Sequence, residues 1–322
     1  MNLMKLVVKD YFMDVNGLDG RIQLSDVDGE GDNFDTLSEI HEWVDAIVGG
    51  RLAGWEEDEE RAKEILNKVY SFRFDERFRY SENICLFFET YRTYLASSSL
   101  EMRISNGFAD NLKNLIALIR SAANQQFRAR VASRKRSAVN NQQSAHELVD
   151  RLFDEYEKLH VIRLDLLLEK GGAQFVSVED AHARLKFFLG DRRRDAIHSE
   201  LVGYIWKLEY FPGKGVYFHV VLFLHTKTSQ NHRKLVKRFG EYWNNVATGM
   251  KGGYIFIDEK LARLRFGGSG EVKSEDQEKR RALTHGLDYI IHKDVFLQPL
   301  HFVVDGRKKM RTFGKSNKLD HA

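Results

Sequence analysis

Cysteine and proline are scarce in this chain of 322 residues, which contains one cysteine and two prolines. A single cysteine excludes an internal disulfide and a thiolate metal cluster built within one chain. Cys85 lies in the apolar sequence ICLFF, which is typical of a core position rather than of a reactive nucleophile. Pro212 and Pro299 lie outside the segments with a helical pattern, where proline would interrupt backbone hydrogen bonds.

Long apolar runs are also lacking, because charge interrupts every strand-like stretch within about ten positions, whereas a membrane-spanning helix needs roughly 18 apolar residues. The first residues, MNLMKLVVKDYF, have too short an apolar stretch and too early an acid for a secretory signal. Hydrophobic residues make up 43% and charged residues 30%, the balance of an ordinary globular protein. We therefore expect a cytoplasmic protein with no membrane partner.

The small net charge of +3 hides an uneven distribution. Residues 1–60 contain sixteen acids and four bases, a net charge of −12, so the other 262 residues carry +15. A basic body favours a polyanionic partner, with the acidic segment shielding it or keeping it soluble. An ordinary solvated surface explains the same composition equally well, so charge alone does not decide.

The first 140 residues have a mostly helical pattern and no catalytic motif that indicates a function. Residues 37–48 and 58–72 have apolar residues at three- and four-residue spacing, whereas residues 17–35 are typical of turns. Residues 26–37 place acids at the first, third and fifth positions of a calcium-loop pattern. Leu37 stands where that pattern requires glutamate, so we expect no calcium site.

Residues 121–144 are poor in large apolar side chains and rich in Arg, Gln, Asn and Ser. This composition predicts a linker or an exposed basic arm. It separates a helical N-terminal region, residues 1–140, from a second domain, residues 144–316. Ser144 can cap a helix over residues 146–160 at the start of that domain.

Beyond residue 160, strand and helix patterns alternate. The predicted elements are a strand over 161–169, a helix over 178–194, strands over 203–211 and 215–226, a helix over 232–246, a strand over 252–258 and a helix over 278–293. The β-α-β-β-α-β order is the ferredoxin-like (RRM-like) split motif, whose antiparallel central sheet leaves one face available for a ligand. We predict an α+β fold in which one such domain, from about Val161 to Lys315, follows the helical region.

The central hairpin carries the first group of residues whose side chains could bind a metal or take part in catalysis. Tyr217 and His219 share one strand face because they are two residues apart, and His225 lies further along. Glu209 on the preceding strand can meet them across the pair. A carboxylate beside an imidazole suits Mg²⁺ or Mn²⁺, with waters or phosphate oxygens completing the shell. A surface pair or a satisfied polar group in the core is the alternative.

The second group lies on the last predicted helix. Tyr289 and Lys293 are four residues apart and therefore share a face, with His285 one turn earlier. Ordinary amphipathic packing explains a tyrosine at such a position equally well.

The order of these motifs resembles that of the HUH endonucleases, named for histidine-hydrophobic-histidine. It consists of an apolar strand with Asp165, a hairpin strand with Glu209, a Tyr-Phe-His strand and a helix with Tyr-x-x-x-Lys. More narrowly, GYIWKLEYFPGKGVYFHVVLFL, GEYW and RTFGKS resemble the YagK/YfjJ C-terminal domain family, the inovirus-type gene-two replication proteins. The resemblance covers roughly the C-terminal half of the chain.

This resemblance implies a sequence-specific nickase of a phage, prophage or plasmid that starts rolling-circle DNA replication. Tyr289 would attack the scissile phosphate and form a covalent phosphotyrosine, and Lys293 would position or neutralise that phosphate. His219 and Glu209 would hold Mg²⁺ or Mn²⁺ as a Lewis acid. Tyr217 stands in place of the first motif histidine, and a neutral phenol is a poor ligand for these ions. The implied partners are single-stranded DNA at a replication origin and host helicase or replication proteins.

Three basic clusters are candidates for holding the DNA strand, and their neutralised phosphates would make affinity fall steeply with salt. They comprise Arg192, Arg193 and Arg194; Arg233, Lys234, Lys237 and Arg238; and Arg307, Lys308, Lys309 and Arg311. Tyr204, Trp206, Tyr210 and Phe218 offer stacking faces if they are exposed, with core packing as the alternative.

Other functions remain open. Tyr217 favours a second hypothesis, a catalytically impaired nucleic-acid-binding protein or regulator with the same fold. RNA binding on the sheet face ranks below both because the aromatic RNP signature is absent. FGKS is not a Walker A motif, since Lys309 stands where the earlier glycine is required, and RFGGSGE favours a flexible turn.

Overall fold

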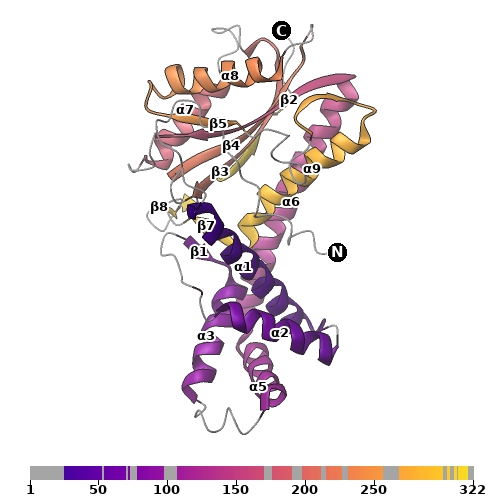
Figure 1. The fold of residues 1–322 in the computed structure, drawn as a ribbon, viewed down its shortest axis with the longest axis vertical. Coiled ribbons are helices and arrows are strands. Elements are labelled where there is room, and N and C mark those ends of the chain that lie inside the picture. Colours follow the sequence, from indigo (N-terminus) through magenta and orange to yellow (C-terminus); the bar gives the residue numbers. More distant parts are fainter. Residues whose placement is uncertain are drawn as a thin grey trace. The chain divides into compact units, whose positions relative to one another are not determined.

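The computed structural model describes residues 25–52, 54–69, 72, 78–97, 107–169, 176–190, 198–211, 215–226, 231–256, 268–299, 303–304, 308–309 and 311–317. Helices and antiparallel strands confirm the α+β class and the helical N-terminal part (Figure 1). No helix in these ranges is long and apolar enough to cross a bilayer.

The chain divides into two compact units. We call one the helical unit; it comprises Asp28–Val139 and Lys293–Leu300. The other, the sheet unit, comprises Met1–Val27, Asn140–His292 and His301–Ala322.

The helical unit consists of helices and one small ribbon. Its elements are α1 (Ser25–Gly49), α2 (Trp55–Val69), α3 (Glu82–Ser97), α5 (Gly107–Ala122), the first part of α6 (Gln125–Glu155), the 3-10 turn η3 (Lys293–Val295), and strands β1 (Phe78–Tyr80) and β7 (Leu297–Pro299), which pair antiparallel. The apolar spacing that predicted α1 and α2 is the spacing of their buried side chains, which include Ile40, Val44, Ile47 and Ile65.

Helix α1 begins earlier than its sequence predicts. Residues 25–35, predicted as turns, belong to α1, so the turn prediction was wrong there and the calcium-loop pattern lies on a helix. Acidic residues are favourable in the first turn of a helix as well as in turns, so the acidic composition of this stretch does not distinguish the two. Residues 17–24 lie outside the described residues.

The predicted basic linker is a helix. Residues 125–144 are the first part of α6, so the linker prediction was wrong, and the helix predicted over 146–160 instead ends at Glu155. Three cations of this segment, Arg128, Arg134 and Lys135, have partners within the helical unit. Arg134 pairs with Glu82 at 3.0 Å and donates to the Asp294 carbonyl oxygen at 3.3 Å.

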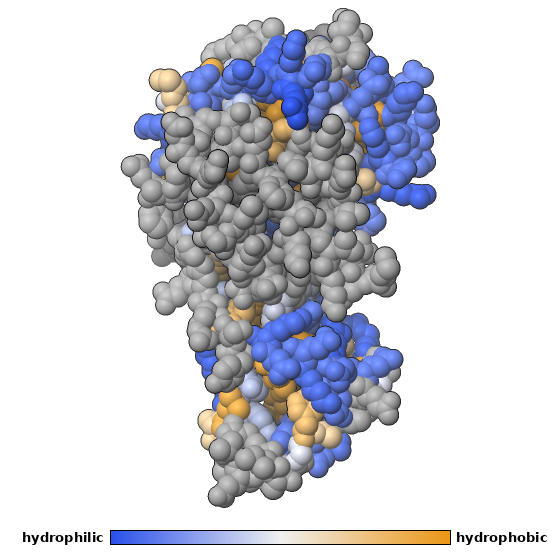
Figure 2. All heavy atoms as spheres, viewed as in Figure 1, coloured by the Kyte–Doolittle hydropathy of each residue, from blue (hydrophilic) through white to orange (hydrophobic). Residues whose placement is uncertain are grey.

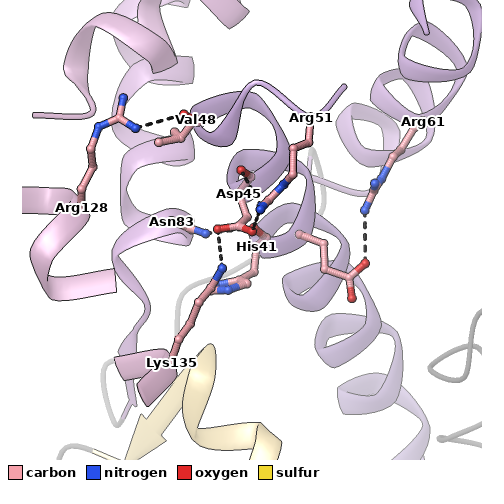
Figure 3. A network of polar contacts seen from close by, with 9 residues as sticks. His41, Asp45, Val48, Arg51, Arg61, Asn83, Arg128 and Lys135 are labelled. Carbon is pink, nitrogen blue, oxygen red and sulfur yellow. Dashed lines mark hydrogen bonds and ion pairs between the residues drawn. The ribbon is translucent and has the colours of Figure 1, made fainter. Parts of the chain in front are cut away.

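Asp45 of α1 is the centre of a second set of contacts with α6 (Figure 3). Lys135 and Arg51 both pair with its carboxylate, and Arg128 donates to the carbonyl oxygen of Val48. Burial raises the pKa of Asp45, but the neighbouring Lys135 and Arg51 cations outweigh this effect and hold it below its ordinary value. Lys135 and Arg128 thus attach α6 to α1.

The sheet unit contains an antiparallel sheet. Its elements are the second part of α6, β2 (Lys158–Leu167), α7 (Val178–Gly190), β3 (Leu201–Phe211), β4 (Gly215–Leu224), α8 (His232–Tyr242), the π-helical turn η2 (Trp243–Ala247), β5 (Gly253–Phe256), β6 (Gly270–Lys273), α9 (Gln277–His292) and β10 (Phe313–Lys315). A separate ribbon pairs β8 (Val303–Val304) with β9 (Lys308–Lys309). The strand order is β10-β3-β4-β2-β5, and β6 also pairs with β2.

Helices cover both faces of this sheet (Figure 1). On one face, α7 and α8 bury a cluster that includes Phe188, Phe218, Phe239 and Trp243. On the other face, α6 and α9 bury a second cluster with Val221, Leu287 and Ile291. The face predicted to remain available for a ligand therefore lies under α9.

Strand β6 was not expected from the sequence. Gly268 and Gly270 both have positive φ, of 91° and 80°, as the turn reading of RFGGSGE requires. The following residues, however, pair with the start of β2, with Val272 opposite Leu159. The turn prediction was therefore wrong from Gly270 onward.

Replacing Arg134 tests the role of α6. Its side chain is 8% exposed and bonds a carboxylate and a carbonyl, so Arg134→Met should lower the free energy of unfolding by about 2 kcal/mol. Arg136→Met on the same helix, at an exposed position, is the control and should change it little. Urea unfolding followed by circular dichroism measures both; equal effects would contradict the proposed attachment.

Candidate functional site on the sheet face under α9

A row of polar side chains crosses the centre of the sheet on the face that α9 covers. Asp165 of β2 lies opposite His219 of β4, which in turn lies opposite Lys207 of β3. In the next row, Tyr217 lies opposite Glu209. Strand alternation gives all five side chains one direction, away from the core under α7 and α8.

His219 makes two hydrogen bonds that fix its tautomer. Its Nδ1 lies 2.8 Å from Oδ1 of Asp165, and its Nε2 lies 3.3 Å from Nη2 of Arg163. A guanidinium is only a donor, so Nε2 accepts and Nδ1 carries the proton that it donates to the carboxylate. The imidazole is therefore neutral, with both nitrogens engaged.

The pKa of His219 agrees with a neutral ring. Burial lowers this pKa below its ordinary value, and the positive charge of Arg163 acts in the same direction, against the opposing carboxylate of Asp165. A proton on Nε2 would also place an N–H group against the guanidinium.

Glu209 and Tyr217 form the second polar pair. The Tyr217 hydroxyl donates to Oε2 of Glu209 at 2.6 Å, and both side chains are buried. Tyr217, predicted in place of a metal-binding histidine, thus lies beside the predicted carboxylate ligand. The short contact occupies one carboxylate oxygen with a neutral donor.

Helix α9 closes this face with apolar side chains. Leu287, Ile290 and Ile291 line a small hollow together with His219 and Lys207. At Gly286 the backbone of α9 lies close against the Arg163 side chain, because a Cβ atom added there would lie 2.5 Å from Nη1 of Arg163. The fully buried guanidinium is therefore enclosed between the sheet and the backbone of α9.

Tyr289 has a different direction from the residues that contact the sheet. The buried residues of α9 are Leu283, Gly286, Leu287, Ile290 and Ile291, whereas Tyr289 is half-buried. At 100° per residue it leaves the helix nearly opposite Leu287, and it is not among the residues lining the hollow beside His219. Helix α9 ends at His292, so Lys293 begins the 3-10 turn instead of continuing the helical face.

The predicted basic residues have different environments. Arg233, Lys234, Lys237 and Arg238 are all exposed on α8, and Lys237 lies 3.5 Å from Glu241. Arg311 donates to the carbonyl oxygen of Phe313 and lies 5.9 Å from the centroid of the Trp206 ring. Lys308 and Lys309 form β9, whereas Arg192, Arg193, Arg194 and Arg307 lie outside the described residues. Trp206 and Phe218 are buried and therefore offer no stacking face.

The arrangement around His219 does not fit a divalent metal ion. An imidazole ligand needs a free ring nitrogen, with the other nitrogen donating to a carboxylate or carbonyl. Asp165 fulfils the second condition, but Arg163 occupies the position in front of Nε2. Within the described part of the chain, no three His, Cys, Asp or Glu side chains are grouped to hold a metal.

The sequence predicted Glu209, Tyr217 and His219 together on one face and named Asp165 on the preceding strand, but Arg163 and Lys207 were not predicted. Arg163 shares a strand face with Asp165 because the two are two residues apart. That two-residue spacing is the sequence signal for Arg163, although the strand is otherwise almost continuously apolar.

Comparisons with protein-family models, with curated proteins and with solved structures found no match.

The neutral His219 predicts an acid-sensitive fold. Its folded-state pKa lies below the ordinary value of 6.5, so the unfolded chain binds a proton more readily. The stabilisation is complete above pH 6.5 and is lost as pH falls through the window below it, and burial of His160 acts in the same direction. His219→Gln should weaken the dependence of the unfolding free energy on pH in this window. The exposed His285→Gln is the control; an unchanged slope in His219→Gln would contradict the assignment.

Proposed function

We propose that this protein binds single-stranded nucleic acid, using the ferredoxin-like scaffold of the replication nickases without their metal-dependent chemistry at His219. The β3-β4-β2-β5 order, with α7 and α8 as crossovers, supports that scaffold because it is the strand order of the split βαβ motif. The proposed relation to the replication nickases rests on the motif resemblance in the C-terminal half of the sequence.

The exposed cations of α8 carry the proposal. Arg233, Lys234, Lys237 and Arg238 occupy two turns of one helix, and its buried side chains Leu235, Val236 and Phe239 fix the cations outward. Hydrophilic side chains gather at the end of the sheet unit that carries α8 (Figure 2). Such a row of cations can neutralise several phosphates along one nucleic-acid strand, which releases the counterions of those phosphates.

Exposed apolar side chains on the helical layer that includes α8 favour a single strand over a duplex. Phe187 of α7 is 44% exposed, and Val246 and Met250, which follow α8, are 51% and 70% exposed. Unstacked bases pack on exposed aromatic and apolar groups, whereas a duplex keeps its bases inside. α7 and η2 contact each other directly, so these side chains belong to the same helical layer as the cations.

The closed polar row argues against nicking at His219. A strand cut there would have to bring its phosphate to an imidazole that is 5% exposed and bonded on both nitrogens. Tyr289 is half-buried on α9 and is not among the residues that line the hollow beside His219. Binding with impaired catalysis is therefore the form of the function that the geometry favours.

Nicking remains the second candidate, and one observation favours it. Asp165 and His219 are paired on the two central strands, and α9, the helix with Tyr289, packs over that same face. The sequence resemblance implies a nickase in which the tyrosine of this helix attacks a phosphate held near His219.

Removing two α8 cations tests the binding surface. We expect Lys234→Gln/Arg238→Gln to weaken binding of a labelled single-stranded oligonucleotide of mixed sequence. The slope of log affinity against log salt should fall by about 1.4, because each single-strand phosphate contact contributes about 0.7. Fluorescence anisotropy over a salt series measures the slope.

The matched control removes two exposed arginines from the other basic segment, as Arg130→Gln/Arg136→Gln on α6. The change in net charge is the same, so a general electrostatic effect would weaken both variants equally. Equal weakening of both variants, or tighter binding of duplex DNA than of single-stranded DNA, would contradict the proposed binding surface.

Incubation with Mn²⁺ and single-stranded oligonucleotides tests the chemistry. We expect no covalent protein-DNA adduct on denaturing gels, with wild type and Tyr289→Phe alike. An adduct that Tyr289→Phe abolishes would establish the nickase instead.

A further inference from the structure

We propose that Arg163 is the resident cation of the buried polar row: its guanidinium holds the place of a divalent ion at Nε2 of His219, and its removal opens that place to a metal. The inference concerns metal binding and does not depend on nucleic-acid binding.

The first argument is position. Nη2 of Arg163 lies 3.3 Å from Nε2 of His219, on the side where a metal-bound imidazole would have its ion. The opposite nitrogen donates to Asp165, as the non-ligating nitrogen of a metal-bound histidine commonly does. The histidine therefore has the second partner of a metal ligand, with a guanidinium in place of the metal.

The second argument is enclosure. Arg163 has no exposed surface, and Gly286 allows the α9 backbone to lie directly against Nη1. A buried cation cannot leave a pairing partner without a large free-energy cost. A metal ion approaching Nε2 would have to displace the guanidinium and lift α9 at the same time.

The third argument is charge. In their ordinary ionisation states, Arg163 and Lys207 contribute two positive charges to this face, and Asp165 and Glu209 contribute two negative charges. The neutral His219 leaves the row balanced. A divalent ion added to this set would leave two positive charges uncompensated in the protein interior, which is strongly unfavourable.

Removing the guanidinium changes this balance. Arg163→Ala leaves a net negative charge and a free Nε2 lone pair beside the hollow that His219 and Lys207 line. Co²⁺ suits an imidazole ligand, with water oxygens completing its shell, and reports on it by visible absorption. The variant should be less stable than wild type without metal, since it leaves Asp165 unbalanced.

The experiment measures the melting temperature of tag-free full-length protein with and without Co²⁺. For Arg163→Ala, Co²⁺ at about 100 times its dissociation constant should raise the melting temperature by roughly 5 to 10 °C and give visible absorption bands. Wild type and Arg163→Lys, which retains the charge, should show neither effect. The double variant Arg163→Ala/His219→Gln should lose both.

Arg184→Ala is the matched control, because it removes an arginine from α7 on the opposite face of the sheet, where Arg184 donates to the carbonyl oxygen of Leu168 at 3.0 Å. Co²⁺ should not stabilise it. A folded Arg163→Ala that gains no stability from Co²⁺ would overturn the proposal.

If Arg163→Ala does not fold, the wild-type protein tests whether Arg163 keeps metal ions away from His219. The ¹⁵N resonances of the His219 ring should show a protonated Nδ1 and an accepting Nε2, and Mn²⁺ should leave them unbroadened. Selective broadening of these resonances by Mn²⁺ would show that the ion reaches the ring despite Arg163, and the inference would fail.

Discussion

The bond between the Arg163 guanidinium and His219 determines what the central sheet of this protein can do. It fixes the imidazole as a neutral ring, with its proton on the nitrogen that faces Asp165. It also requires a glycine at position 286, since no side chain fits between the guanidinium and the α9 backbone. The identity of one strand residue thus sets the tautomer of its neighbour and the distance at which a helix packs.

The polar row also shows how a face predicted to bind a ligand becomes interior. Strand alternation predicts correctly that Tyr217 and His219 point to one side of the sheet. It does not predict that Leu287 and Ile291 of a helix more than sixty residues later cover that side. A polar row under a helix must satisfy its own hydrogen bonds and balance its own charge. Arg163 and Lys207 fulfil these needs, which explains why both are buried without belonging to an open site.

The sequence predicts the elements of the sheet unit well because their signals are local. The central strands alternate or are continuously apolar, and the start of α8 carries a capping Asn231 whose side chain accepts from the backbone of Lys234. Predictions failed where the signal is tertiary. Helix α6 lacks a strong apolar stripe in its first part, and its partners, Asp45 and Glu82, lie 90 and 52 residues earlier in the sequence. Strand β6 has four residues, too few for a pattern, and exists because the start of β2 offers a free edge.

The uneven charge of the chain has two different consequences. In the helical unit, acids and bases from distant segments neutralise each other, as Lys135 does with Asp45 and Lys68 with Glu39. A basic run in the sequence is therefore not by itself a nucleic-acid interface. The α8 cations differ because their helix buries its apolar face against the sheet and directs them outward, with Glu241 as an acid on the same helix. The α8 cations lie on the surface of a rigid element, whereas Arg134 and Lys135 of α6 pair with carboxylates and Arg163 of the polar row is fully buried.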